Sequence, residues 1–296
     1  MGLQKFVLLA IFGLVAQLID GALGMAYGLT STTLLLTAGL APAVASASVH
    51  LAEVGTTLAS GAAHWKLGNT DWRAGRWLAL PGGVGAFTGA TVLSNLDGDA
   101  ARPWISLFLV ILGAYVLVRF AFLGGRIQVR EGSLRRPFLA PLGLVAGFLD
   151  AIGGGGWGPL ATPTMLASGR MEPRRVIGTV STSEFVVALS ASVGFLISLD
   201  TSVFALPVVL ALLVGGSIAA PIAAWTVRWL HPRILGAAVG GLIVVTNGRT
   251  VFNAIGVEGN PQVAAYAALL VIWCAAIVVV VRSVRQERVQ SAMAVA

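Results

Sequence analysis

The chain has 296 residues, of which 57% are apolar and only 10% are charged, and its mean hydropathy is +0.88. About a quarter of the residues in a soluble domain are charged, so this composition excludes a soluble globular protein and indicates an integral membrane protein. The net charge of +7 does not by itself indicate nucleic-acid binding, because the basic residues stand between apolar runs, where they orient membrane segments. The single cysteine, Cys274, lies inside such a run, so no disulfide framework is expected.

Eleven apolar segments follow one another along the chain. Each is expected to be a helix, because backbone inside a bilayer must satisfy its own hydrogen bonds. The first run lacks a small-residue cleavage site, so we take it as retained structure and not as a signal peptide. We therefore predict an all-α integral membrane protein, a polytopic helical bundle with segments at 4–22, 26–40, 43–64, 75–96, 103–123, 138–152, 157–168, 174–199, 202–228, 233–254 and 261–282.

The second half of the chain repeats the first. The string GLVAQLIDGALGMAYG, which begins at Gly13, returns about 130 residues later as GLVAGFLDAIGGGGWG, which begins at Gly143. A duplicated apolar unit with an acidic residue and a glycine-rich break in each copy is typical of transporters. The matched pairs include Asp20 with Asp150, Gly24 with Gly154, Gly28 with Gly158, Thr32 with Thr162 and, after a one-residue slip, Glu53 with Glu184.

The repeat predicts the organisation of the chain. Residues 1–123 form the first repeat, 124–136 a cytoplasmic linker, 137–255 the second repeat, and 256–296 an extra C-terminal helix with a short cytoplasmic tail. Five segments per repeat is an odd number, so the second copy is expected to have inverted topology. The number of crossings per repeat stays odd if the first two segments of each repeat form a re-entrant hairpin, because this removes two crossings.

Basic residues gather after the odd-numbered segments. Examples are the stretches 66–76, 126–136 and 170–175, and matching loops of the two halves carry opposite charge patterns. The positive-inside rule places these loops in the cytoplasm, the N-terminus outside and the C-terminus in the cytoplasm. We expect a multi-pass protein of the cell (inner, cytoplasmic) membrane.

A glycine-rich break precedes the second segment at 21–24 and the seventh at 153–156. A helix that starts after such a break presents free N–H groups and a positive partial charge, which suit an anion. Inverted repeats would bring both helix starts together near the membrane midplane. The alternative that the glycines only allow close helix packing stays open. The predicted substrate-binding residues are Gly24, Thr30, Thr32, Gly154, Gly155, Gly156, Trp157 and Thr162.

Ionisable residues at membrane depth are costly and usually functional. His50 stands three residues before Glu53, on the same helix face, where it could share a proton with that carboxyl group. For the acidic residues next to the breaks, the alternative is that they cap exposed N–H groups. The residues predicted to act in proton coupling or gating are Asp20, His50, Glu53, Asp150 and Glu184.

The sequence contains no Walker loop, no His/Cys metal spacing, and no GxSxG or HExxH motif. We therefore expect no enzyme activity, no catalytic residues, no cofactor and no metal. The expected partners are a small anionic substrate and the lipid bilayer, without nucleic acid; a homodimer is left open.

Four strings in order carry a resemblance to a known family: LIDGALGMAYG at Leu18–Gly28, GTTLASGAAHWKLGNTDW at Gly55–Trp72, GGVGAFTGA at Gly82–Ala90, and GFLDAIGGGGWGPLATP at Gly147–Pro163. Over roughly 6–282 the chain resembles the TauE/SafE family of sulfite and organosulfonate exporters. The resemblance implies secondary transport of a small sulfur-containing anion such as sulfite, a sulfonate or sulfoacetate, linked to protons.

We therefore expect a secondary transporter that works by alternating access around a midplane site. The alternatives are a gated anion channel with the same polar lining, and an importer of the same substrates. An intramembrane enzyme is disfavoured. The first copy has Leu23 and Met25 where the second has Gly153 and Gly155, so the two halves need not contribute equally.

Overall fold

The computed structural model describes residues 2–23, 25–122, 134–168, 170–200, 206–226 and 232–293. Gly24 and residues 124–133 of the predicted linker lie outside the described residues. The described ranges form eleven α-helices, and each predicted segment overlaps one of them, although the last helix runs well past the predicted end at 282. The helices are α1 (Leu3–Leu23), α2 (Tyr27–Thr37), α3 (Pro42–Lys66), α4 (Trp72–Ser94), α5 (Gly98–Phe122), α6 (Arg136–Gly153), α7 (Trp157–Ala167), α8 (Pro173–Ser198), α9 (Leu206–Thr226), α10 (Pro232–Ala254) and α11 (Asn260–Met293).

Local signals in the sequence set several helix ends. The side chain of Asp71 accepts hydrogen bonds from the first N–H groups of α4, at 3.0 Å from Arg73 and 3.0 Å from Ala74. Proline stands in the first turn of α6 and of α8, where its missing N–H costs nothing. At the other end of α6, Gly154 adopts a left-handed conformation with φ of 67° and ends the helix.

Helix length separates membrane-crossing helices from shorter ones. Within the described residues, six helices are long and apolar enough to cross a membrane: α1, α4, α5, α6, α8 and α11. The helices α2 and α7 have 11 residues each. At 1.5 Å per residue each is about 16 Å long, roughly half the hydrocarbon thickness of a bilayer, so neither crosses it alone.

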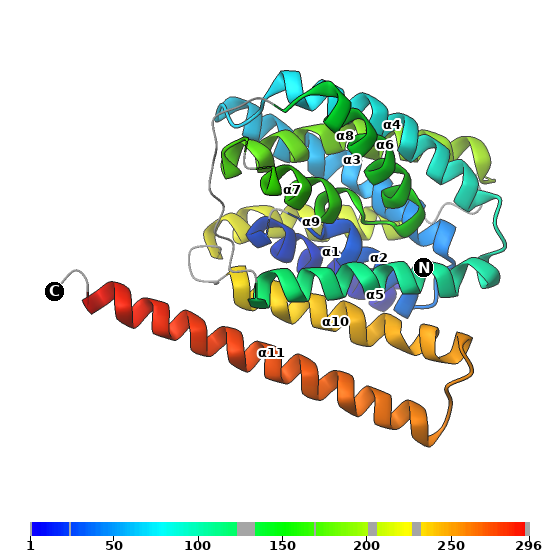
Figure 1. The fold of residues 1–296 in the computed structure, drawn as a ribbon. Helices are drawn as coiled ribbons and strands as arrows, with labels where there is room; N and C mark the ends of the chain where they lie inside the picture. Colours follow the sequence, from blue (N-terminus) through cyan, green and yellow to red (C-terminus); the bar gives the residue numbers. More distant parts are fainter. Residues whose placement is uncertain are drawn as a thin grey trace.

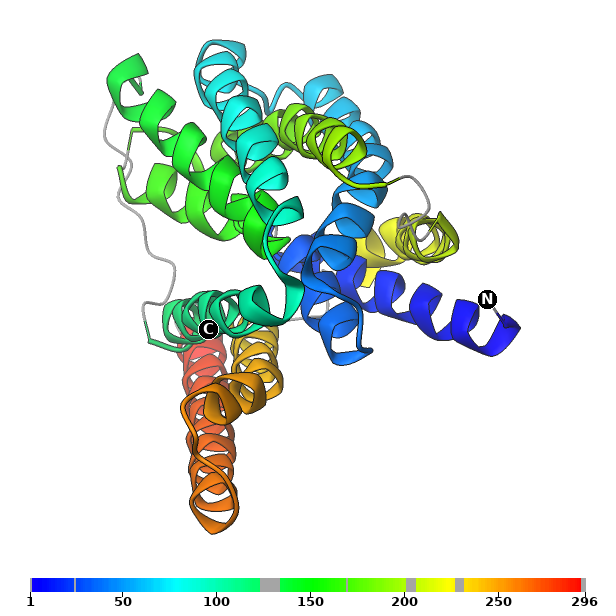
Figure 2. The same cartoon turned by 90° about the vertical axis from the view of Figure 1, so that its right-hand side faces the viewer.

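The helices of one half pack on those of the other (Figures 1 and 2): α1 lies along α9, α4 along α6, and α5 along α10. Glycines make these contacts close. Gly13 of α1 lies against the backbone of Leu212 in α9, and its repeat equivalent, Gly143 of α6, lies against the backbone of Leu78 in α4. Neither glycine has room for a side-chain carbon, as in other close contacts between membrane helices. The two halves are therefore interlocked.

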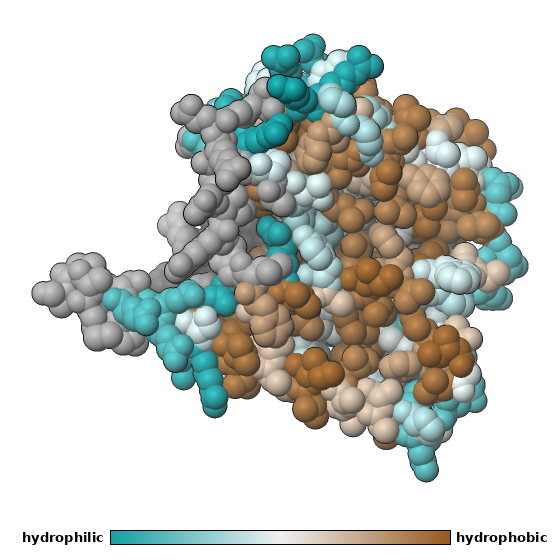
Figure 3. Space-filling model, viewed as in Figure 1, coloured by the Kyte–Doolittle hydropathy of each residue, from teal (hydrophilic) through white to brown (hydrophobic). Residues whose placement is uncertain are grey.

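The outer surface of the bundle is apolar. Leu80 and Val84 of α4 are 62% and 61% exposed, and Figure 3 shows apolar residues across the middle of one face with polar residues toward its edges. The helix α11 lies at the margin of the bundle, against α10 and α5 (Figure 2). Only 11% of its most apolar stretch is buried. This distribution suits a molecule surrounded by lipid.

Candidate functional site at the paired helix breaks

The α1–α2 and α6–α7 connections, here called the paired breaks, meet inside the bundle. Gly28 at the start of α2 lies so close to the other break that an added Cβ would be 2.8 Å from the carbonyl oxygen of Gly154 and 2.8 Å from Cα of Gly155. The repeat equivalent of Gly28 is Gly158, and a Cβ there would be 3.0 Å from Cβ of Met25. Since Met25 is the repeat equivalent of Gly155, the two contacts join matching positions of the two copies.

A hydrogen bond crosses between the breaks. The hydroxyl of Thr32 in α2 donates to the carbonyl oxygen of Gly154 at 2.6 Å. The left-handed backbone of Gly154 favours glycine, and a Cβ at this position would collide with the Thr32 side chain. Two predicted substrate-binding residues thus contact each other, and the Thr32 hydroxyl already has a protein acceptor.

The acidic residues at the breaks cap the short helices. Oδ1 of Asp20 accepts a hydrogen bond from the backbone N–H of Tyr27 at 3.2 Å, and Oδ1 of Asp150 accepts one from Trp157 at 2.8 Å. These pairs occupy matching positions in the two repeats. Both carboxyl groups therefore have the capping geometry that the sequence left as an alternative, and capping does not exclude a second role.

The N–H groups that remain at the two helix starts are unequal in number. In the second break, the N–H groups of Gly154 and Gly155 donate to the backbone oxygen of Asp150, at 2.6 and 3.2 Å. The first residues of a helix have no intrahelical acceptor for their N–H groups. Apart from the two capped residues, this leaves Gly28 and its successor in α2. In α7 it leaves only Gly158, because a proline follows.

Two hydroxyl groups near these helix starts are buried without a partner. Thr30 in α2 is 2% exposed and Thr162 in α7 is 1% exposed. Neither hydroxyl oxygen has a hydrogen-bond partner among the described residues. Most buried polar groups are hydrogen-bonded, so an unpaired one needs an explanation. Both were predicted to bind substrate, and both hydroxyls are available to accept or donate a hydrogen bond.

His50 in α3 faces the second break. Its Nε2 lies 3.1 Å from Oδ2 of Asp150, and its Nδ1 lies 2.8 Å from the backbone oxygen of Ser46. The hydroxyl of Ser46 in turn donates to the backbone oxygen of Ala151 at 2.6 Å. The sequence offered Glu53 as the partner of His50, but the structure places Asp150 from the other repeat there. The contacts join α3 to the end of α6.

The two glutamates complete a cluster of acidic residues around the paired breaks. Oε1 of Glu53 lies beside Gly28, 2.8 Å from where a Cβ would be. The carboxyl group of Glu53 interacts electrostatically with those of Asp150, Glu184 and Asp20. All five residues predicted for proton coupling or gating therefore come from four helices to one region. Among the described residues, no group of His, Cys, Asp or Glu has an arrangement that could hold a metal ion.

Two contacts around the site were not predicted. Asn247 in α10 is buried and donates to the hydroxyl of Thr33 in α2 at 3.1 Å. The indole N–H of Trp157 donates to the backbone oxygen of Val180 at 3.1 Å. An asparagine inside the apolar run 233–254 was the only sequence signal for the first contact, and it does not identify a partner.

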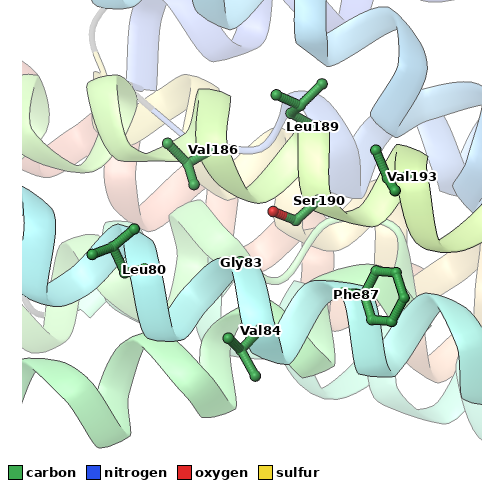
Figure 4. Close-up of a pocket in the computed structure, with 8 residues that line it drawn as sticks. All are labelled: Leu80, Gly83, Val84, Phe87, Val186, Leu189, Ser190 and Val193. Carbon is green, nitrogen blue, oxygen red and sulfur yellow. The ribbon is translucent and has the colours of Figure 1, made fainter.

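A groove elsewhere on the molecule has a different character. It lies between α4 and α8 and has a volume of about 430 Å³ (Figure 4). Seven of its eight lining residues lack a polar side chain: Leu80, Gly83, Val84, Phe87, Val186, Leu189 and Val193; the eighth is Ser190. Several of them belong to the exposed apolar surface, so the groove faces lipid and is not a site for a small anion.

The fold and the paired breaks define a class: a multi-pass α-helical membrane protein in which two glycine-rich breaks meet in the interior among buried acidic residues. Comparison with known proteins gives the family. Residues 9–250 match the sulfite exporter TauE/SafE family, and the chain belongs to it.

Two relatives have similar descriptions. The chain is 49% identical over 288 residues to the probable membrane transporter protein YtnM of Bacillus subtilis (strain 168). That match covers 97% of this chain and 96% of the relative. It is 24% identical over 242 residues to the probable membrane transporter protein YunE of the same organism. That match covers 74% of this chain and 89% of the relative. No solved structure matches the chain. The protein is a membrane transporter and not an enzyme.

Proposed function

We propose that the protein is a secondary transporter that moves a small sulfur-containing anion, of the sulfite or sulfonate class, across the cytoplasmic membrane in a proton-coupled, alternating-access cycle. The substrate class comes from the family description. The observation that carries the site is the meeting of the starts of α2 and α7 inside the bundle, in two helices that also carry the buried, unpartnered hydroxyls of Thr30 and Thr162.

The donors at this site suit a passing anion. The starts of α2 and α7 direct positive partial charge and free N–H groups toward the paired breaks. Gly154, Gly155 and Gly156 have no side chain to keep the anion from the backbone, the N–H groups of Gly154 and Gly155 are held by Asp150, and in this proposal Trp157 forms part of the wall. Neutral donors replace the water shell of an anion without holding it as tightly as a buried arginine would.

The paired contacts support an inverted repeat. The contact of Gly28 with Gly155 corresponds to that of Gly158 with Met25. The packing of α1 on α9 corresponds to that of α6 on α4. In this proposal α1–α2 and α6–α7 are re-entrant hairpins, and rocking of one repeat against the other exposes the site to each side in turn. The basic loops then face the cytoplasm and the N-terminus lies outside.

The acidic cluster supplies a route to proton coupling. An ionised carboxylate next to a bound anion repels it, so Glu53 or Glu184 must be neutral when the anion is bound nearby. Proton binding and anion binding then favour each other, which links the two movements. Asp20 and Asp150 at the breaks, and His50 beside Asp150, belong to the same network.

A gated anion channel would use the same lining. The direct contact of Gly28 with Gly155 closes the region between the helix starts and favours a carrier, which must open and close in every cycle. Flux through a carrier saturates as the anion concentration rises, whereas flux through an open channel continues to rise with concentration. The same assay with the gradient reversed separates export from import.

Binding to the purified protein tests the proposal first. Sulfite, sulfate, thiosulfate, sulfoacetate, taurine and chloride are added in turn, and thermal unfolding is followed; a ligand that binds the native state raises the Tm. We expect one sulfite-like or sulfonate anion to stabilise the protein, and Gly154→Val to abolish the effect. If no anion in the panel raises the Tm of folded wild-type protein, the anion assignment is wrong.

A further inference from the structure

The two ring contacts of His50, with Ser46 and with Asp150, together hold one proton more than a neutral imidazole and a carboxylate supply. Nδ1 of His50 lies 2.8 Å from the carbonyl oxygen of Ser46, which only accepts hydrogen bonds, and 3.3 Å from the Ser46 hydroxyl, which donates to Ala151, so with these contacts Nδ1 carries a hydrogen. The bond from Nε2 to Oδ2 of Asp150 then needs one more proton. Either an imidazolium donates to a carboxylate, or a carboxylic acid donates to a neutral imidazole. When this proton leaves, the neutral imidazole has a single N–H for two acceptors, the Ser46 carbonyl and Asp150, so it cannot donate to both, and the charge that strengthens the contact with Asp150 is lost.

The same carboxyl group holds the start of α7. While Oδ2 of Asp150 faces His50, Oδ1 accepts the backbone N–H of Trp157. His50 is fully buried and Asp150 is 3% exposed, so water does not readily replace a lost partner. A change at the shared proton therefore acts on the orientation of Asp150, and through it on the first turn of α7.

The first repeat has no such arrangement. Asp20 caps Tyr27 as Asp150 caps Trp157. With the one-residue slip of the repeat, the position that corresponds to His50 is Ser181, whose hydroxyl lies 2.9 Å from the hydroxyl of Ser60. The two caps are thus alike, and among the described residues an imidazole contacts only the second.

We infer that His50 is a positioning residue whose shared proton with Asp150 locks the start of α7, so that the α6–α7 hairpin is the proton-sensitive gate and the α1–α2 hairpin is not. This assignment rests on the proposed function. It goes further by naming the carrier of the proton and the half of the molecule that responds to it.

Other charges surround the pair. Acidic groups face it from α1 (Asp20), from its own helix (Glu53) and from α8 (Glu184), and Tyr27 lies on α2. The helices α4 and α5, which also contact α3, carry their charged residues near their ends, and α9 has no titratable residue in 206–226. Phe195 of α8 packs 6.1 Å from the imidazole, between ring centres. The test therefore separates His50 from the acidic neighbours.

Hydrogen exchange at the two helix starts gives a readout that needs no transport. After correction for intrinsic exchange rates, we expect wild-type protein to lose protection at the start of α7 by about tenfold as the pH is raised, the effect of one lost hydrogen bond, with no such change at the start of α2. In His50→Gln the amide donates to the Asp150 carboxylate at every pH. Protection at α7 then becomes independent of pH.

Two variants serve as controls. His64→Gln changes another histidine of α3, one that lies outside the pair, and should keep the wild-type pH response. Asp20→Asn retains an oxygen that caps Tyr27 and should also keep the response at α7. The assignment is overturned if protection at α7 is independent of pH in the wild type, if His50→Gln keeps the dependence, or if Asp20→Asn removes it.

Flux measurements separate this assignment from the proposed function. Sulfite is the probe, in vesicles that contain the purified protein, with and without a pH gradient. If wild-type protein moves sulfite but exchange at α7 does not respond to pH, the lock is wrong and the transporter proposal stands. If the exchange behaves as expected and no sulfite moves, the lock stands and sulfite transport is wrong.

Discussion

The hydroxyl of Thr32 donates a 2.6 Å hydrogen bond to the carbonyl oxygen of Gly154. The two residues are 122 positions apart, in different copies of the repeat; Gly154 lies in the second break and Thr32 in α2, the helix that follows the first. This bond ties together the two helix starts that form the proposed anion site. A cycle of alternating access that separates the breaks must break it and form it again.

Replacing Thr32 with valine removes this bond and keeps the shape of the side chain. A neutral hydrogen bond contributes about 1 kcal/mol, and the buried carbonyl oxygen of Gly154 loses its donor, so we expect a fall of about 1–2 kcal/mol in the free energy of unfolding. Thermal unfolding measures it. Thr37→Val is the matched control, because the Thr37 hydroxyl bonds only to its own helix, at the oxygen of Thr33. Equal stability of the two variants would contradict the prediction.

Gly155→Ala tests the close approach of the breaks. A Cβ at Gly155 would collide with the backbone of Gly28 and Leu29, which cannot move aside as a side chain can. Overpacking of this kind costs about 1–3 kcal/mol, so both stability and anion-dependent stabilisation should fall. Gly98→Ala is the control, since a Cβ there meets nothing closer than 3.9 Å. A variant at Gly155 that binds and unfolds like the wild type would show that the breaks do not need this contact.

Thr30→Val and Thr162→Val separate folding from binding. Each hydroxyl is buried without a partner among the described residues, so its removal should change the free energy of unfolding by less than about 1 kcal/mol. Each loses one donor to the anion, so binding should weaken by roughly three- to tenfold. Titration of the Tm with the stabilising anion measures both effects. Thr88→Val, at an exposed hydroxyl that bonds within α4, should change neither.

Glu53→Gln and Glu184→Gln test proton coupling. A glutamine is neutral at every pH, so it no longer switches between repelling and admitting the anion. We expect one or both variants to move the anion at a rate that does not respond to a pH gradient. The measurement is initial flux into vesicles with the internal pH fixed and the external pH varied. Unchanged pH dependence in both variants would remove these residues from the coupling mechanism.

Arg233→Ala tests the attachment of α11. The guanidinium donates to the backbone oxygens of Phe120 and Ala121 at the end of α5, and to Ser283 and Glu287 of α11. Loss of these charged hydrogen bonds should cost about 2 kcal/mol in thermal unfolding. Glu287→Gln should cost less than about 1 kcal/mol, because that side chain is half-exposed and the pair is screened. A larger loss of stability in Glu287→Gln than in Arg233→Ala would contradict this prediction, because it would mean that the ion pair makes the main contribution to the attachment.

Much of the fold could be predicted from sequence, because the bilayer allows few choices. An uncharged run such as 103–123 must be helical wherever it packs, and α5 (Gly98–Phe122) confirms it. The short lengths of α2 and α7 were also visible, since a glycine-rich break precedes each segment and a short turn follows it, uncharged after α2 and basic after α7. The repeat predicted that the breaks meet, and the contact of Gly28 with Gly155 is that meeting.

The partners of individual side chains could not be predicted in the same way. Helical spacing places His50 and Glu53 on one face of α3, but it does not say which helix covers that face. The answer depends on the packing of α6, 100 residues later, which brings Asp150 to Nε2. The occupied N–H groups of Gly154 and Gly155 depend on the local path of the break, which a run of four glycines leaves open.

The interlocked packing of α1 with α9 has a consequence for biosynthesis. As the chain leaves the ribosome, α1 enters the bilayer long before Leu206–Thr226 has been translated, so its glycine-lined face first meets lipid or an insertion chaperone. The proposed anion site likewise does not exist until α7 has been inserted beside α2. Assembly must therefore wait for most of the chain, and a fragment that ends at the linker has neither its packing partners nor a site.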